Sequence, residues 1–166
     1  PGYRMNLAAS IRIAVGLPMI DVLEELLRKI RPYEKVKGSA DKAFEKAMDA
    51  VVEGLETKGI PGARRGFKKA VDIMNQIEYD RTSPRPGVLI VGEYLLNFHP
   101  GANHDIEAYL EKNGFEIIEA RMTDVIRKTY FYHDSQNREY HLKRPLIQKI
   151  WYHVANKAFD IAHDMT

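Results

Sequence analysis

The sequence has no cysteine among its 166 residues. Disulfide bonds are therefore excluded, as is a zinc or iron–sulfur site with thiolate ligands from this chain alone. No apolar run reaches the roughly 20 residues of a membrane-spanning helix. The first residues lack the basic flank and apolar block of a signal peptide. The sequence therefore predicts a cytoplasmic protein with no membrane partner.

An excess of either charge is also missing, since 25 basic residues face 23 acidic ones and the net charge is +2. Such a balance gives no electrostatic reason to expect nucleic acid as a partner. Phosphate-binding glycine loops of the P-loop or dinucleotide type are absent. The sequence also shows no motif that pairs a nucleophile with a base, so catalytic residues stay unknown.

What the sequence does contain is a helical pattern over its first half. Leucines and isoleucine recur at helical spacing over residues 23–30, and Pro32 should end this helix near Arg31. Residues 7–18 fit a strand or a helix, and we favour a helix that breaks near residues 16–18. Two further helices are predicted, over residues 40–56, with Ser39 as N-cap and Gly59 at the end, and over residues 61–78.

The second half reads as strand, loop, helix and strand. Residues 88–91 are continuously apolar, which is typical of a strand buried on both faces. A loop over residues 92–102 follows, then a helix over residues 105–113 that Asn103 caps and Gly114 ends, and a strand over residues 115–120. This order predicts a βαβ unit with parallel strands. Thr123 is a predicted cap for another helix, and the last helix should cover residues 145–163.

The predicted fold class is therefore α/β: helix-rich, with a small parallel sheet in an incomplete Rossmann-like or flavodoxin-like unit, plus a helical segment. Residues 1–80 are expected to form the helical segment and residues 81–166 the α/β unit with a C-terminal helix, the alternative being one continuous domain. Two strands do not make a stable sheet by themselves. Missing strands would come from residues 7–15, from outside this chain or from a partner subunit, so we expect a piece of a larger protein.

The candidate ligand-binding residues are clustered between the first strand and the next helix, where open α/β sheets bind ligands. They are Glu93, Asn97, His99, Asn103 and His104. The helix N-terminus that follows favours an anion. Each residue also has a purely structural interpretation, as a cap or a turn. The two histidines lack a third ligand, so no metal site is predicted.

A different basic cluster lies at the start of the third predicted helix, in Arg64, Arg65, Lys68 and Lys69. It could bind phosphate. In a chain with almost no net charge, a solvated helix face is the more common explanation.

Two stretches of the sequence resemble a known family. One is RPGVLIVGE at residues 85–93, continued by FHP at 98–100 and LEKNG at 110–114. The other is DVLE at residues 21–24 and RPYE at 31–34. Their order and spacing are similar to those of the large activators of 2-hydroxyglutaryl-CoA dehydratase, also described as 2-hydroxyacyl-CoA dehydratase activases. The resemblance spans residues 21–129.

The resemblance implies a long cytoplasmic parent protein. In that family an amino-terminal ATPase part holds a [4Fe-4S] cluster, and a later part with stacked α/β domains is similar to the dehydratase subunits. This chain would come from the later part, so ATP and the cluster are implied only for the parent, and no cofactor is expected here. Of the residues that match the family stretches, Glu93, Asn97, His99 and Asn103 lie in the loop, and Arg31 and Glu34 lie in the upstream turn.

The function expected from the resemblance is therefore that of one domain in a 2-hydroxyacyl-CoA dehydratase activator-like protein, not catalytic by itself. Residues 92–105 would contact a CoA or other anionic ligand, or dock another domain. The expected partners are the rest of the parent polypeptide, the dehydratase component or a second copy. The alternatives are a structural docking domain with no small-molecule site and a free-standing enzyme that uses His99 or Glu93 as a general base.

Overall fold

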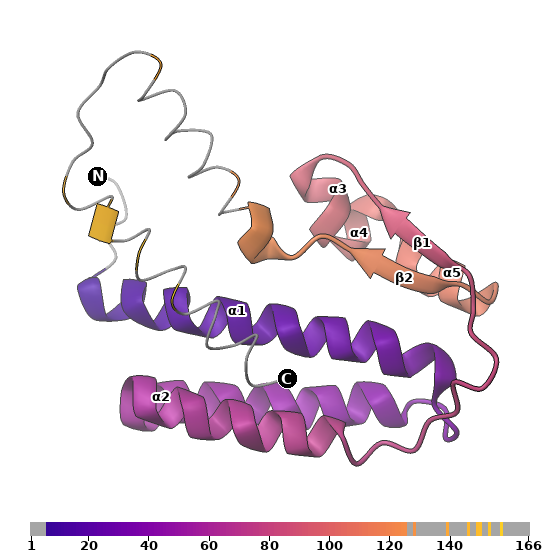
Figure 1. The fold of residues 1–166 in the computed structure, drawn as a ribbon, viewed down its shortest axis with the longest axis horizontal. Helices are drawn as coiled ribbons and strands as arrows, with labels where there is room; N and C mark the ends of the chain where they lie inside the picture. Colours follow the sequence, from indigo (N-terminus) through magenta and orange to yellow (C-terminus); the bar gives the residue numbers. More distant parts are fainter. Residues whose placement is uncertain are drawn as a thin grey trace.

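The computed structural model describes residues 6–125 and, further along, residues 128, 139, 146, 149, 150, 153 and 157. Its elements are α1 Leu7–Ile30, the 3-10 helix η1 Arg31–Tyr33, α2 Ser39–Met74, β1 Gly87–Ile90, α3 Tyr94–Phe98, α4 Pro100–Asn103, α5 Ile106–Lys112 and β2 Glu116–Glu119. We call α1 and α2 the helical layer and residues 87–125 the α/β unit. Helix α1 lies between α2 and the α/β unit (Figure 1). The predicted helix-rich α/β class with a small parallel sheet is confirmed. Most of the predicted last helix lies outside the described residues.

Helix α1 runs without a break through Pro18, so the predicted interruption at residues 16–18 is wrong. A proline inside a helix removes one backbone hydrogen bond and normally kinks the helix. Here Gly16, Pro18 and Met19 are all buried, and packing against α2 outweighs that local cost. The predicted end is confirmed, since α1 stops at Ile30 and Pro32 lies in η1.

Helix α2 is a hairpin of two helical arms. The chain turns at Lys58 and Gly59, where Gly59 has a left-handed φ of 58°, as the predicted break requires. The arms lie side by side (Figure 1). A side-chain carbon on Gly66 would overlap the carbonyl oxygen of Ala50 in the other arm, so glycine lets the backbones touch. The second arm ends at Met74, before the predicted end at residue 78.

The start of α2 corrects a second prediction, because Ser39 is not its N-cap. Gly38 occupies that position. The carboxylate of Glu34 accepts hydrogen bonds from the backbone nitrogens of Gly38 at 2.6 Å and Ala40 at 2.7 Å, and from the Ser39 hydroxyl at 3.2 Å. The turn after η1 brings Glu34 to the helix end, where a carboxylate is favoured by the free amides and the helix dipole.

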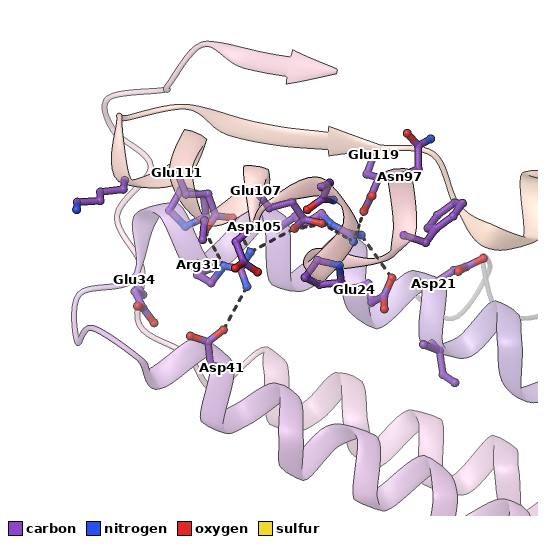
Figure 2. A pocket seen from close by; sticks show the side chains of 18 of the residues that line it. Asp21, Glu24, Arg31, Glu34, Asp41, Asn97, Asp105, Glu107, Glu111 and Glu119 are labelled. Carbon is purple, nitrogen blue, oxygen red and sulfur yellow. Dashed lines mark hydrogen bonds and ion pairs between the residues drawn. The ribbon is translucent and has the colours of Figure 1, made fainter. Parts of the chain in front are cut away.

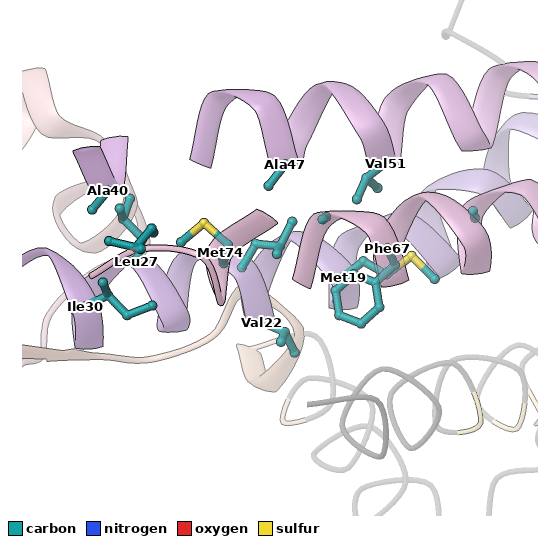
Figure 3. Close-up of a cluster of buried hydrophobic side chains, with 13 residues drawn as sticks. Met19, Val22, Leu27, Ile30, Ala40, Ala47, Val51, Phe67 and Met74 are labelled. Carbon is teal, nitrogen blue, oxygen red and sulfur yellow. The ribbon is translucent and has the colours of Figure 1, made fainter. Parts of the chain in front are cut away.

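The main hydrophobic core belongs to the helical layer and to Ile77, which follows it directly (Figure 3). Helix α1 supplies one wall and the two arms of α2 supply the other. Within the described residues, the α/β unit contributes no side chain to this core. The buried members are Met19, Val22, Leu23, Leu27, Ile30, Ala40, Ala47, Val51, Ala63, Phe67, Ala70, Met74 and Ile77.

The sheet has two parallel strands, as predicted, with Gly87 opposite Glu116 and Ile90 opposite Glu119. The expectation that residues 88–91 are buried on both faces is wrong. Helices α1 and α5 contact β2, and Ile117 on the inner face is 3% exposed. On the outer face Leu89 is 59% exposed and Ile118 is 50% exposed. The helices of the described part therefore cover only one face of this sheet.

The close approach of the α2 arms gives a first prediction, for the variant Gly66→Ala. The new methyl group would overlap backbone atoms of Ala50, which cannot rotate away, so the arms must separate. Overpacking costs about 1–3 kcal/mol and outweighs the roughly 1 kcal/mol gained in helix propensity. Because the overlap is with backbone atoms, the cost should lie at the upper end of this range, and urea unfolding should show a net loss of up to about 2 kcal/mol. Arg65→Ala, at an exposed position of the same arm, should change stability by less than about 0.5 kcal/mol. Equal stability of the two variants would contradict the close packing.

Candidate functional site

A cleft of about 1000 Å³ lies between the helical layer and the α/β unit (Figure 2). Charged side chains dominate its walls: eight of the lining residues are acidic and five are basic. The helical layer and η1 with the turn after it provide Asp21, Glu24, Arg28, Arg31, Glu34, Lys37 and Asp41. The linker and the α/β unit provide Arg85, Asp105, Glu107, Glu111, Lys112 and Glu119.

Strand β2 runs antiparallel to α1 along one side of this cleft. The Tyr33 hydroxyl donates to Glu116 at 2.8 Å. Further along the chain, Glu119 pairs with Arg28, then Arg121, after the end of β2, pairs with Glu25, and finally Thr123 bonds to Asp21. The order of the partners on α1 is the reverse of their order on this segment, so polar contacts follow one another along a single strip.

Two arginines of neighbouring helix turns hold the centre of the strip. Arg28 Nε lies 3.2 Å from Glu107 Oε2, and its guanidinium also pairs with Glu119. Arg31 Nε lies 2.7 Å from Glu111 Oε2, and its Nη2 lies 3.5 Å from Glu107. Figure 2 shows Arg31 between Glu111 and Asp41, with the Asp41 contact at 3.3 Å. We call these pairs, together with Arg121–Glu25, the ion-pair clamp.

Glu119 is the most perturbed member of the clamp. Its side chain is 1% exposed. Burial raises the pKa of this carboxyl group to about 7, against the lowering effect of Arg28. The nearby carboxylates of Glu107 and Glu24 raise it further, because like charges disfavour ionisation. A proton therefore resides on Glu119 in part of the molecules at neutral pH.

Asp21 anchors the far end of the strip. Its carboxylate accepts from the backbone nitrogens of Met122 at 3.2 Å and Thr123 at 2.8 Å, and from the Thr123 hydroxyl. Burial raises the pKa of Asp21, while the bonds from Thr123 and Met122 lower it. The prediction that Thr123 caps the helix after β2 is wrong. That helix already includes Met122, and Asp21 of α1 satisfies its first amides instead.

The five residues predicted as ligand contacts do not converge on one point. Asn97 and Asn103 line the cleft. Glu93, His99 and His104 are exposed and are not among the residues that line it.

Two of these residues have structural roles that their positions explain. The Glu93 carboxylate accepts from Leu95 N at 3.0 Å and so caps α3. The Asn103 amide donates to Leu96 O at 3.0 Å and accepts from Ile106 N at 3.4 Å, so it joins three short helices. Its predicted effect on the first turn of α5 is thus present, although Asp105 occupies the N-cap position.

The predicted loop over residues 92–102 is also wrong in part, because α3 and α4 occupy most of it. These helices have five and four residues. Neither completes two turns, so no 3.6-residue pattern can be read from the sequence.

The clamp residues Arg28, Glu107, Glu111 and Glu119 were not singled out by the sequence analysis. A signal does exist, because Glu107 and Glu111 are four residues apart and so share one face of a helix. Arg28 and Arg31 are three apart and do the same. The sequence does not show that these two charged faces meet, since the pairs are about 80 residues apart along the chain.

No group of three or more His, Asp or Glu side chains among the described residues could hold a metal ion. None of the described helices is both long and apolar enough to cross a bilayer. No protein-family model, curated protein or solved structure matches this chain.

The raised pKa of Glu119 predicts a pH dependence of stability that Glu119→Gln should remove. Between pH 4.5, its usual pKa, and about 7, the folded chain holds a proton that the unfolded chain releases. This stabilisation is complete at low pH and is lost as pH rises through 7. One pKa unit corresponds to about 1.4 kcal/mol, so wild type should lose about 2–3 kcal/mol relative to the variant between pH 5 and pH 8.

Urea unfolding at several pH values measures this difference. Glu45→Gln, which removes an exposed carboxylate of α2, is the matched control and should keep the wild-type pH dependence. Parallel pH profiles for wild type and Glu119→Gln would show that Glu119 is ionised throughout this range.

Proposed function

We propose that this chain is a docking domain of a 2-hydroxyacyl-CoA dehydratase activator-like protein, and that it binds another part of the same parent polypeptide. The outer sheet face and residues 92–105 form the docking surface. The observation that carries the proposal is the exposed apolar face: Leu89 is 59%, Val91 75% and Ile118 50% exposed. Clusters of this kind on one unit are typical of interaction sites.

The segment predicted to bind a ligand supports docking as well. In α3, which directly follows the loop after β1, Leu95 and Leu96 are 54% and 49% exposed. Within the described residues each strand has one neighbour only, so each keeps a free edge. Free edges and an open apolar face suit an added strand or helix from a neighbouring domain.

An anionic ligand such as CoA fits the cleft less well. The cleft has more acidic than basic lining residues. Arg28 and Arg31, its central cations, are already paired with glutamates. Phosphate groups would have to displace those carboxylates, at a cost in charge repulsion with Glu24 and Glu119. The docking interpretation is therefore favoured over a CoA contact.

The docking proposal predicts that Leu89→Glu/Ile118→Glu weakens association with the rest of the parent polypeptide, expressed as a separate piece. Charges at the centre of an apolar interface should raise the Kd by about tenfold or more, which corresponds to about 1.4 kcal/mol. Calorimetry or biolayer interferometry measures the Kd. The folding of the double variant should be unchanged, since both side chains are exposed.

Val36→Glu/Val52→Glu is the matched control, because both valines are exposed but lie in the helical layer or the turn before α2. It should bind like wild type. Equal affinity of both double variants, or no association of the wild-type pieces, would refute this docking surface.

A ligand screen separates docking from the CoA alternative. Thermal unfolding with CoA, an acyl-CoA and ATP should show no concentration-dependent rise in Tm, because a ligand of the folded state alone would stabilise it. A rise that His99→Ala abolishes would instead favour ligand contact by residues 92–105. His99→Ala is preferred to Asn103→Ala because the Asn103 side chain joins the short helices.

A further inference from the structure

The α/β unit and the helical layer meet mainly through charges and polar groups. Every member of the main hydrophobic core lies at or before Ile77, in the helical layer or directly after it. Polar contacts across the interface include the pairs of Arg28, Arg31 and Glu25 with the α/β unit, the bonds between Asp21 and Thr123, and the Tyr33–Glu116 bond. Helix α1 also contacts β2, whose Ile117 is buried. The helical layer is therefore held together mainly by apolar packing, whereas charges have a large part in holding the α/β unit against it.

The chain between them gives the α/β unit one narrow connection. Backbone bonds from Lys35 to Glu78 and from Asp80 to Tyr33 fix the chain as far as residue 80. Residues 81–84 and 86 are exposed. Within this linker, Arg85 N donates to the Tyr33 hydroxyl at 2.9 Å. Arg81 pairs with Glu116 at 2.8 Å, Arg85 Nη1 donates to Glu111 O at 3.2 Å, and Pro86 O accepts from Glu116 N at 3.0 Å. The bonds to Glu111 and Glu116 attach the linker to the α/β unit, and none of the four bonds involves the apolar core, so residues 81–86 can rearrange without disturbing it.

Tyr33 is placed as a pivot for such a movement. The guanidinium groups of Arg81 and Arg85 lie 5.2 and 5.7 Å from the centre of its ring. Its hydroxyl group also contacts Glu116 at the start of β2. These contacts lie at the same end of the α/β unit as the linker, whereas Asp21 holds the opposite end.

The clamp is the part of this interface that salt can weaken. The side chains of Arg28 and Arg31 are 16% and 23% exposed, so water and ions reach them. Screening by dissolved ions weakens such pairs, while NaCl does not weaken the apolar contacts of the helical layer. The two parts should therefore differ in their response to ionic strength.

We propose that the α/β unit is a lid on the cleft, which is held shut by the ion-pair clamp and opens as one body about residues 81–86. The helical layer keeps its fold when the lid opens. Opening exposes the acidic walls of the cleft and frees Arg28 and Arg31 from their glutamates. The lid is a property of the interface and does not depend on the docking proposal, which concerns the outer face of the sheet.

Hydrogen exchange of the whole chain at 0.05 and 1 M NaCl tests this lid. Opening as one body leaves the bonds inside the α/β unit intact but breaks those that the Met122 and Thr123 amides donate to Asp21. These two amides should therefore exchange about tenfold faster at high salt, while core amides of α1 and α2 should keep their rates. Salt-independent exchange of the Met122 and Thr123 amides, or an equal acceleration in α2, would overturn the proposal.

A pair of variants connects the effect to the clamp. Arg31→Gln should speed exchange of the Met122 and Thr123 amides about fivefold at low salt and reduce the effect of added NaCl. Arg12→Gln is the matched control, because Arg12 is an exposed arginine of α1 that does not line the cleft. Wild-type exchange in Arg31→Gln, or an equal effect of Arg12→Gln, would show that the clamp does not hold the lid.

Discussion

The structure depends on helix α1 presenting two faces of different chemistry. Leu23 and Leu27 point into the apolar core with α2, while Arg28, and Arg31 directly after the end of α1, face the α/β unit. In a helix with 3.6 residues per turn, one step along the chain rotates the side chain by about 100°. If α1 rotated about its axis, the guanidinium group of Arg28 would move toward the core, where an unpaired charge is very costly. The core with α2 therefore fixes where the α/β unit can bind.

The charged face of α1 fixes the orientation of the α/β unit more than it contributes to the free energy of folding. Partly buried ion pairs lose hydration, and this loss cancels much of their attraction. Arg28 also has more carboxylates around it than one cation can neutralise, since Glu24, Glu107 and Glu119 all lie close. The raised pKa of Glu119 follows from this excess, because protonation of one carboxyl group relieves repulsion in a site that water barely reaches.

The sequence pattern predicted the long helices, α5, the turn at Gly59 and the parallel strand pair, because these features depend on neighbours in the chain. It failed where a side chain outside the helix in question decided the outcome. Glu34, in the turn before α2, bonds to the first amides of α2 in place of Ser39. Asp21 of the distant helix α1 supplies the cap expected from Thr123. The outer face of β1 is exposed because helices pack on one side only, which an apolar run cannot reveal. The clamp was missed for the same reason, since its partners meet only in the folded chain.

The candidate loop shows why polar residues after a strand are an ambiguous sign of ligand binding. Glu93 and Asn103 use their side chains to cap and join α3, α4 and α5, and such bonds fix the direction of each short helix. Once α5 is fixed, Glu107 and Glu111 point toward α1. The side chains of Glu93 and Asn103 thus act by fixing the positions of these helices. They set the inner side of the α/β unit against the charges of α1 and leave its apolar outer side open.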